Sequence, residues 1–387
     1  MVQQSRSHEQ HQQTAFRKAE KKYKRLVQPA DLSDVVDFSA IDGSPDKTAG
    51  VSRIYLTEDL ATPPSLPFEA YRQKRPPAYV LDNHPGLVVI PDALTNEAQR
   101  WLARKCLCDC TRPPNRTNLN PFFELPAEPL FALAFPRSAT YGQSSAPDCS
   151  LMDPEDCAVP GRLKTIRSRA ETNSVHAEVT VPKAKFYTQS ESPMGLLDRL
   201  RWCTLGQQYN WTTKEYDLGT CAFDSDLDSV MKSIAETITQ PAVSDNQMQL
   251  LASGCEKSAF VSQAGIINYY DQGATMAGHV DKTEENMDAP LISMCIGLSC
   301  IYLVGGLTRD TEPTALILRS GDVLAMCGAS RLAFHGVPKV LPGTSPAYLA
   351  KPAAGINDVG AEGYPEWQHF AAYLETHRIN CNARKCS

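Results

Sequence analysis

Short apolar runs, separated by Gly, Asp, Ser and Pro, occupy most of the sequence from about residue 200 onward. Typical runs, one or two strands long, are "SAFVSQAGIINYY", "LISMCIGLS", "CIYLVGGL", "TALILRSGDVLAMC" and "SRLAFHGV", and "RSGDV" has the composition of a turn. Helical segments do not alternate with these runs. The pattern therefore favours a sandwich or jelly roll over a sheet built from β-α-β units.

Three segments have a helical pattern instead. A basic helix is predicted near residues 14–27, and "TNEAQRWLARKCL" predicts a helix with Thr95 as its N-cap. "PEWQHFAAYLETHRINCNARKC" predicts a helix over 366–377 and then a final strand. Together with the buried strand "PGLVVIPDAL", these elements predict a mainly β protein with flanking helices, of class α+β.

The composition divides the chain into two parts. Residues 1–85 are predicted to form an N-terminal extension, in which the basic helix is followed by a Pro-rich linker or extended wrap over 57–85. Residues 86–387 are predicted to form the main domain. A long insertion interrupts it over about 108–192, where apolar periodicity fades.

The overall composition is that of a soluble globular protein, with 42% hydrophobic and 21% charged residues among 387. No apolar run approaches the ~20 residues that a membrane span requires, and the first fifteen residues lack the apolar segment of a secretory signal. We therefore expect the 13 cysteines to be reduced thiols of an intracellular protein. The alternating Cys106, Cys108 and Cys110 do not match the paired spacing of structural zinc sites, which favours thiols without a metal.

The net charge of −6 does not exclude a nucleic-acid partner, because local basic patches decide such binding. Two basic clusters are present, one at 17–25 in "FRKAEKKYKR" and one at 162–169 in "RLKTIRSRAE". Each is compatible with a solvated helix face or a disordered arm as well as with phosphate contacts.

His279 and Asp281 lie two residues apart in a stretch with a strand pattern, so their side chains are predicted to share one face and to grip one metal ion. His335 follows at the end of another predicted strand. Two His and one carboxylate are the facial triad of non-haem Fe(II) oxygenases. The alternatives are a chance pair in a surface turn with a core His335, or a zinc hydrolase that uses the same three ligands.

Arg378, Asn380 and Arg384 stand at offsets 0, 2 and 6 of the final predicted strand and are therefore expected to share one face. Two guanidinium groups and an amide on one face suit a small dicarboxylate, because Arg binds carboxylates in bidentate fashion. An ordinary polar edge strand is the alternative.

Eight residues of this region occur in the order and spacing of a known family. They are Asn268, Tyr270, His279, Asp281, His335, Arg378, Asn380 and Arg384, in the motifs "NYY", "HVD", "RLAFH" and "RINCNAR". The sequence thereby resembles the AlkB family of Fe(II)/2-oxoglutarate dioxygenases, over roughly 86–104 and 196–387. The phrases "LRWCTLGQQYNW" and "HGVPKVLP" resemble the AlkB homologue 1 branch in particular. Asn382 departs from the family pattern, in which Thr or Ser is usual.

This resemblance implies a double-stranded β-helix, a jelly roll with the metal at its mouth, against which an N-terminal helical extension packs. The implied Fe(II) ligands are His279, Asp281 and His335. For 2-oxoglutarate, the implied partners are Arg378, Tyr270 and Asn380 at the distal carboxylate, and Asn268 and Arg384 at the end near the metal. The implied reaction consumes O2, oxidises a methyl group on nitrogen and releases formaldehyde, succinate and CO2.

The family's usual substrates are methylated bases. The branch implies N6-methyladenine in unpaired or bulged DNA, or 1-methyladenine or modified cytosine in tRNA. A base must leave a duplex to reach a recessed metal. We expect Trp211 or Tyr209 to line its pocket, the alternative being that both are core aromatics. The two basic clusters, with Arg199 and Arg201, are the expected phosphate contacts.

Two other functions are compatible with the sequence. The same chemistry could serve a histone or other protein demethylase or hydroxylase, or the chain could be a non-catalytic nucleic-acid-binding relative. The intact triad and arginine pair argue against a non-catalytic protein. We expect a monomer without membrane association, in the nucleus, the mitochondrion or both, with the cytoplasm as a further compartment.

Overall fold

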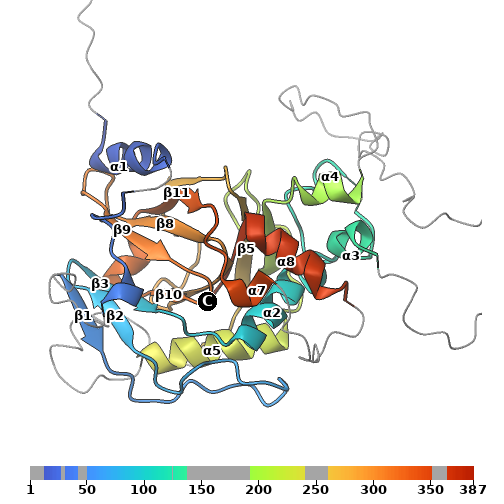
Figure 1. Ribbon diagram of the computed structural model, residues 1–387, viewed down its shortest axis with the longest axis horizontal. Helices are drawn as coiled ribbons and strands as arrows, with labels where there is room; N and C mark the ends of the chain where they lie inside the picture. Colours follow the sequence, from blue (N-terminus) through green and yellow to red (C-terminus); the bar gives the residue numbers. More distant parts are fainter. Residues whose placement is uncertain are drawn as a thin grey trace, which may run out of the picture.

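Two antiparallel β-sheets enclose a buried core in the computed structural model of the protein (Figure 1). The structure describes residues 13–27, 31–41, 50–123, 125–136, 192–239, 260–350 and 364–387, and the structural statements that follow concern these residues. Tyr270 and Cys295 of the large sheet meet Tyr302 and Leu316 of the small sheet in this core.

The large sheet has eight strands in the order β1-β2-β3-β10-β7-β12-β5-β4. They are β1 (Val51–Ile54), β2 (Ala78–Leu81), β3 (His84–Ile90), β4 (Trp202–Gly206), β5 (Ala264–Asp271), β7 (Leu291–Gly297), β10 (Val323–Met326) and β12 (His377–Arg384). The small sheet has the order β6-β11-β8-β9, with β6 (Met276–His279), β8 (Ser299–Val304), β9 (Thr314–Leu318) and β11 (His335–Leu341).

From β5 to β12 the chain passes repeatedly between the two sheets, and all neighbouring strands are antiparallel. This connectivity brings strands that are distant in sequence side by side, as in a double-stranded β-helix. The predicted jelly roll of class α+β is therefore confirmed.

Helices α2 (Asn96–Arg104), α5 (Ser225–Thr239) and α8 (Trp367–Thr376) cover the outer face of the large sheet (Figure 1). Thr95 is the N-cap of α2, as predicted, because its hydroxyl accepts a hydrogen bond from the Ala98 N–H at 3.1 Å. The shorter helices are α3 (Leu130–Ala134), α4 (Pro193–Leu197), α7 (Ala347–Ala350), η1 (Phe38–Ala40), η3 (Lys105–Asp109) and η5 (Gly328–Leu332).

The predicted basic helix is α1 (Ala15–Lys24), and it packs on the outer face of the small sheet (Figure 1). Phe16 and Tyr23 of α1 are buried against Ile301 and Leu303 of β8. None of the helices in the described ranges is long and apolar enough to cross a membrane.

The predicted division at residue 85 falls within strand β3. Strands β1 and β2 precede that residue, yet they extend the large sheet through pairing with β3. The sequence "AYVL" of β2 is buried at every position, which outweighs the prolines around it. The predicted insertion is described at 108–123 and 125–136, where Cys108 and Cys110 are buried free thiols. The basic cluster at 162–169 lies outside the described residues.

Candidate active site

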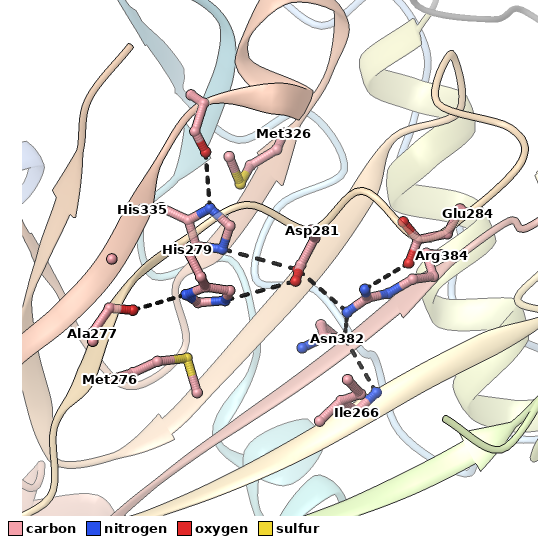
Figure 2. A network of polar contacts seen from close by, with 12 residues as sticks. Ile266, Met276, Ala277, His279, Asp281, Glu284, Met326, His335, Asn382 and Arg384 are labelled. Atoms are coloured by element: carbon pink, nitrogen blue, oxygen red, sulfur yellow. Dashed lines mark hydrogen bonds and ion pairs between the residues drawn. The ribbon is translucent and has the colours of Figure 1, made fainter. Parts of the chain in front are cut away.

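His279, Asp281 and His335 converge at one end of the small sheet (Figure 2). His279 ends β6 and His335 begins β11, and the two residues are direct partners in the antiparallel ladder. The Asp281 carboxylate lies 3.7 Å from His279 Nε2 and 3.9 Å from His335 Nε2. One ligand atom from each residue lies within 4.8 Å of the others, which is a metal-binding arrangement.

The predicted reason for this convergence was wrong in one respect. His279 and Asp281 do not lie on one strand, because β6 ends at His279 and Asp281 belongs to the following loop. The loop turns the carboxylate back toward the two imidazoles (Figure 2). Two strands and one loop therefore supply the three groups.

Backbone carbonyls fix the orientation of both imidazoles. Nδ1 of His279 lies 3.0 Å from the Ala277 carbonyl oxygen, and Nδ1 of His335 lies 3.1 Å from that of Ala333. A neutral ring that donates from Nδ1 leaves the Nε2 lone pair free for a metal. In both residues Nε2 is the nitrogen that faces Asp281.

The charge states also suit a metal. Burial opposes ionisation of Asp281, but Arg384 and the two histidines outweigh it and hold the pKa of that carboxyl well below its usual range. Burial, together with the neighbouring His279, lowers the pKa of His335 to about 4. At neutral pH the site thus presents a carboxylate and a neutral His335, which are the metal-binding forms.

A buried ion-pair network that the sequence motifs did not predict supports this site. Glu284 accepts hydrogen bonds from Arg331 at 2.9 Å, from Arg384 at 2.8 Å and from the Tyr216 hydroxyl at 2.8 Å. Arg331 also donates to the Asp281 backbone carbonyl at 2.6 Å, and Arg384 lies 3.4 Å from the Asp281 carboxylate. The side chains of Arg331, Glu284 and Arg384 are at most 4% exposed. The network therefore holds Asp281 through both its backbone and its side chain.

A cavity of about 250 Å³ extends from the triad into the core between the sheets. All five residues predicted to bind a dicarboxylate line it, namely Asn268, Tyr270, Arg378, Asn380 and Arg384. Alternation along β12 explains part of this set. Ile379, Cys381 and Ala383 pack under the helices, so the even positions face the cavity. Asn382, which departs from the family pattern, lines the cavity as well and accepts a hydrogen bond from Arg384 at 2.8 Å.

Aromatic side chains stand at the rim of this cavity. Trp211 lines the cavity and is 46% exposed, an unusual exposure for so large an apolar side chain. Tyr209 packs edge-on against Trp211, with ring centroids 4.9 Å apart. Trp202 also packs against Trp211, with ring centroids 5.3 Å apart. Tyr209 does not line the cavity, so its place is behind Trp211.

Comparison with known proteins identifies the family. A family model described as the 2OG-Fe(II) oxygenase superfamily matches residues 161–384. The chain belongs to this superfamily. It is 30% identical over 96% of its length to "DNA N(6)-methyladenine demethylase ALKBH1A" of Arabidopsis thaliana, covering 96% of that protein. It is 29% identical to "tRNA demethylase abh1" of Schizosaccharomyces pombe, with 97% of this chain and 96% of that protein covered.

A mammalian relative agrees with these matches. The chain is 31% identical to "Nucleic acid dioxygenase ALKBH1" of Mus musculus, with 96% of this chain and 83% of that protein covered. These relatives place the oxygenase in the AlkB homologue 1 branch of the AlkB family, as the sequence motifs suggested. The chain is therefore a dioxygenase that uses Fe(II) and 2-oxoglutarate.

The donor set of this oxygenase fits both cofactors. Two imidazoles and a carboxylate are a ligand set that would hold Fe(II) and leave coordination positions for a co-substrate. Arg378 is only 2% exposed, and its Nη atoms donate to the Leu298 carbonyl at 3.2 Å and to Cys295 Sγ at 2.8 Å. No carboxylate in the described ranges pairs with Arg378, and its Nε lacks a partner there. A buried cation without a counter-ion at a cavity wall suits a carboxylate of 2-oxoglutarate.

Bound Fe(II) and 2-oxoglutarate supply the oxidising chemistry of the superfamily when O2 reacts. The protein would supply position and environment: the two histidines and Asp281 would hold the metal, and the buried Arg378 would pair with a carboxylate of the keto acid. Leu324, Met326 and Val337 give this cavity apolar walls, which would limit the access of bulk water to the reacting groups.

Proposed function

We propose that this dioxygenase removes methyl groups from nitrogen atoms of bases in nucleic acid. The observation that carries the proposal is the half-exposed Trp211 at the mouth of the cavity that holds the triad. A flat, exposed indole above a recessed oxidising centre is a platform on which a base can stack, because every base has an aromatic face.

The proposed reaction balances with the two cofactors. One oxygen atom of O2 enters 2-oxoglutarate, which loses CO2 and becomes succinate. The other oxygen atom is inserted into a C–H bond of the N-methyl group. The resulting N-hydroxymethyl group breaks at the C–N bond, releases formaldehyde and leaves the nitrogen with a proton.

The finer choice of substrate rests on the relatives. Their names include a DNA N6-methyladenine demethylase, a tRNA demethylase and a nucleic acid dioxygenase. We propose N6-methyladenine in unpaired or bulged DNA, or 1-methyladenine or modified cytosine in tRNA, as the substrates. A base in an intact duplex cannot reach a triad that lies within a cavity, so unpaired positions are favoured.

The proposed phosphate contacts are basic side chains around this site. The outward face of α1 bears Lys18 and Lys24, and also Arg17 and Lys22, which pair with Glu20 and Asp34. Arg201 is partly committed, since it pairs with Asp271 at 3.2 Å, so it has less freedom to reach a phosphate than expected. We also propose the nucleus or the mitochondrion as the compartment, because both contain DNA and the mitochondrion also contains tRNA.

Replacement of Trp211 by Ala is expected to weaken nucleic-acid binding by about 1–3 kcal/mol, the cost of one lost stacking interaction. The change should appear in the dissociation constant for a single-stranded methylated oligonucleotide, measured by fluorescence anisotropy. Trp211→Phe keeps an aromatic face and should retain most of the affinity. Equal binding by the Ala variant and the native protein would show that Trp211 does not stack on the substrate.

Replacement of Arg378 by Met is expected to raise the 2-oxoglutarate concentration needed for half-maximal turnover by about 10- to 100-fold, the value of one lost charge-assisted carboxylate contact. Met has nearly the length of Arg without its charge, so the buried position stays largely filled. Fe(II) binding without the keto acid should be unchanged. An unchanged 2-oxoglutarate requirement would remove Arg378 from the co-substrate site.

The proposed function is tested with a panel of methylated substrates. The panel contains single-stranded and bulged DNA with N6-methyladenine, tRNA with 1-methyladenine, and a methylated histone peptide, each assayed for formaldehyde and succinate. We expect stoichiometric formaldehyde from the unpaired nucleic acids and none from the peptide. Formaldehyde from the peptide alone, or succinate without formaldehyde from every substrate, would contradict the proposal.

A further inference from the structure

The N-terminal helix α1 contacts the strand that ends in the metal ligand His279. We propose that Glu20 of α1 is a positioning residue for the metal site, acting through the backbone of Gly278. Glu20 is 5% exposed although it is ionisable, and such residues are rarely buried without a specific partner. Its Oε1 atom accepts a hydrogen bond from the Gly278 N–H at 2.6 Å.

The strand needs this partner because its own pairing is interrupted. In the ladder between β6 and β11, His279 pairs with His335 and Met276 pairs with Val337, with an irregularity between them. Gly278 has no partner residue in that ladder. Its N–H instead reaches the Glu20 carboxylate, so a side chain of another element replaces the missing strand contact.

Both backbone polar groups of Gly278 are held in the same way. Its carbonyl oxygen accepts a hydrogen bond from Arg309 Nη2 at 2.6 Å. The backbone carbonyl of Arg309 in turn accepts from the Phe16 N–H at 2.9 Å, which ties the arginine to the start of α1. Glu20, Arg309 and Phe16 therefore form a closed clamp on the residue directly before His279.

Close packing holds α1 against the strand. Phe16 is fully buried. A Cβ atom added at Gly278 would lie 2.4 Å from the Phe16 ring, and a Cβ atom added at Gly305 would lie 2.9 Å from the same ring. Such distances leave no room for a side chain at either glycine. The helix is thus seated directly on the β6 backbone, and the Glu20 carboxylate reaches Gly278 without an intervening water.

The geometry makes the position of His279 depend on Glu20. The imidazole of His279 is fixed at Nδ1 by the carbonyl of Ala277, on the other side of Gly278. If Gly278 shifts, the anchor of the ring shifts with it, and Nε2 moves relative to Asp281 and His335. The second Glu20 oxygen pairs with Arg17 at 2.8 Å, so the carboxylate is itself held in place.

Fe(II) affinity separates a positioning role from simple packing. Three variants of the full chain are titrated with Fe(II) under anaerobic conditions in saturating 2-oxoglutarate, and the visible metal-to-keto-acid absorption is followed. Glu20→Ala removes the acceptor, Glu20→Asp keeps the charge but shortens its reach, and Glu20→Gln keeps an acceptor oxygen at the same distance. We expect the Ala and Asp variants to bind Fe(II) about tenfold more weakly and the Gln variant to lie near the native protein, as for other groups that orient metal ligands.

The controls make each outcome decisive. Glu97→Ala changes an exposed glutamate of α2, far from the clamp, and should leave Fe(II) affinity unchanged. Thermal unfolding of each variant shows whether it is folded, and the Asp and Gln variants carry the test if the Ala variant is not. Native Fe(II) affinity in the Asp variant, or equal loss in the Gln and Asp variants, would overturn the proposal. No nucleic acid is present, so the result is independent of the proposed substrate.

Discussion

Replacement of Asp281 by Ala is expected to abolish turnover, with a loss of at least about 100-fold, because it removes a metal ligand and not merely a group that orients one. The two histidines alone provide no negative charge and leave a further coordination position open to water. Fe(II) should therefore bind much more weakly to the variant. The measurement is the absorption band of the Fe(II)–2-oxoglutarate complex under anaerobic conditions, together with succinate formation in air.

The loss should come from the metal site and not from unfolding. Arg384 keeps its ion pair with Glu284 at 2.8 Å when Asp281 is absent, so no buried cation is left without a partner. The thermal midpoint should fall, because the depressed pKa of Asp281 means that its charge stabilises the folded state, but the variant should remain folded at the assay temperature. Asp288→Ala is a matched control, because Asp288 is exposed and lies in the same segment between β6 and β7. Native activity in the Asp281 variant would defeat the assignment of the triad.

The strand pattern was sufficient to predict the jelly roll and most of the cavity wall. Alternation places Arg378, Asn380 and Arg384 on one face of β12, and this rule holds for any regular strand. The same rule failed at Asp281, because periodicity does not show where a strand ends. The carboxylate reaches the metal site through a loop whose course depends on contacts with Arg331 and Arg384.

The buried strand β2 was harder to predict than the strands that carry the site. Residues 57–85 are rich in proline, which is typical of linkers, and this composition concealed the buried β2. The edge of the large sheet can accept such a segment because β3 would otherwise present an unpaired edge. Local composition does not show that β3 needs a pairing partner, because this need arises only once the sheet has formed.

The supporting network around Glu284 could not be predicted from spacing either. Its partners Arg331 and Arg384 lie 47 and 100 residues further along the chain, and Tyr216 lies 68 residues before it. One signal was present, since Arg331 belongs to the "RLAFH" motif that also contains His335. Arg331 lies close to the metal site in this motif, and a buried guanidinium group needs an acidic partner. An acidic residue near Asp281 in the sequence, such as Glu284, could therefore have been expected to pair with it.

Replacement of Glu284 by Ala is expected to destabilise the protein by about 3–5 kcal/mol, because it leaves two buried guanidinium groups without their shared carboxylate. Both arginines are almost fully buried, so water cannot replace the lost partner. Chemical denaturation at neutral pH measures the change in the free energy of unfolding. Fe(II) affinity should fall as well, because Arg331 and Arg384 also hold Asp281.

The pH dependence of stability provides a second test of the same network. Burial opposes the charge on Glu284, but Arg384 and Arg331 outweigh it and lower the pKa of this carboxyl to about 2. A depressed folded-state pKa stabilises the protein above the ordinary pKa of 4.5, and this contribution is lost as the pH falls toward 2. The shift corresponds to roughly 3 kcal/mol in the native protein. Glu284→Gln cannot ionise, so its unfolding free energy should fall less between pH 5 and pH 2. Parallel pH profiles for the two proteins would mean that Glu284 is not the charged partner of the arginines.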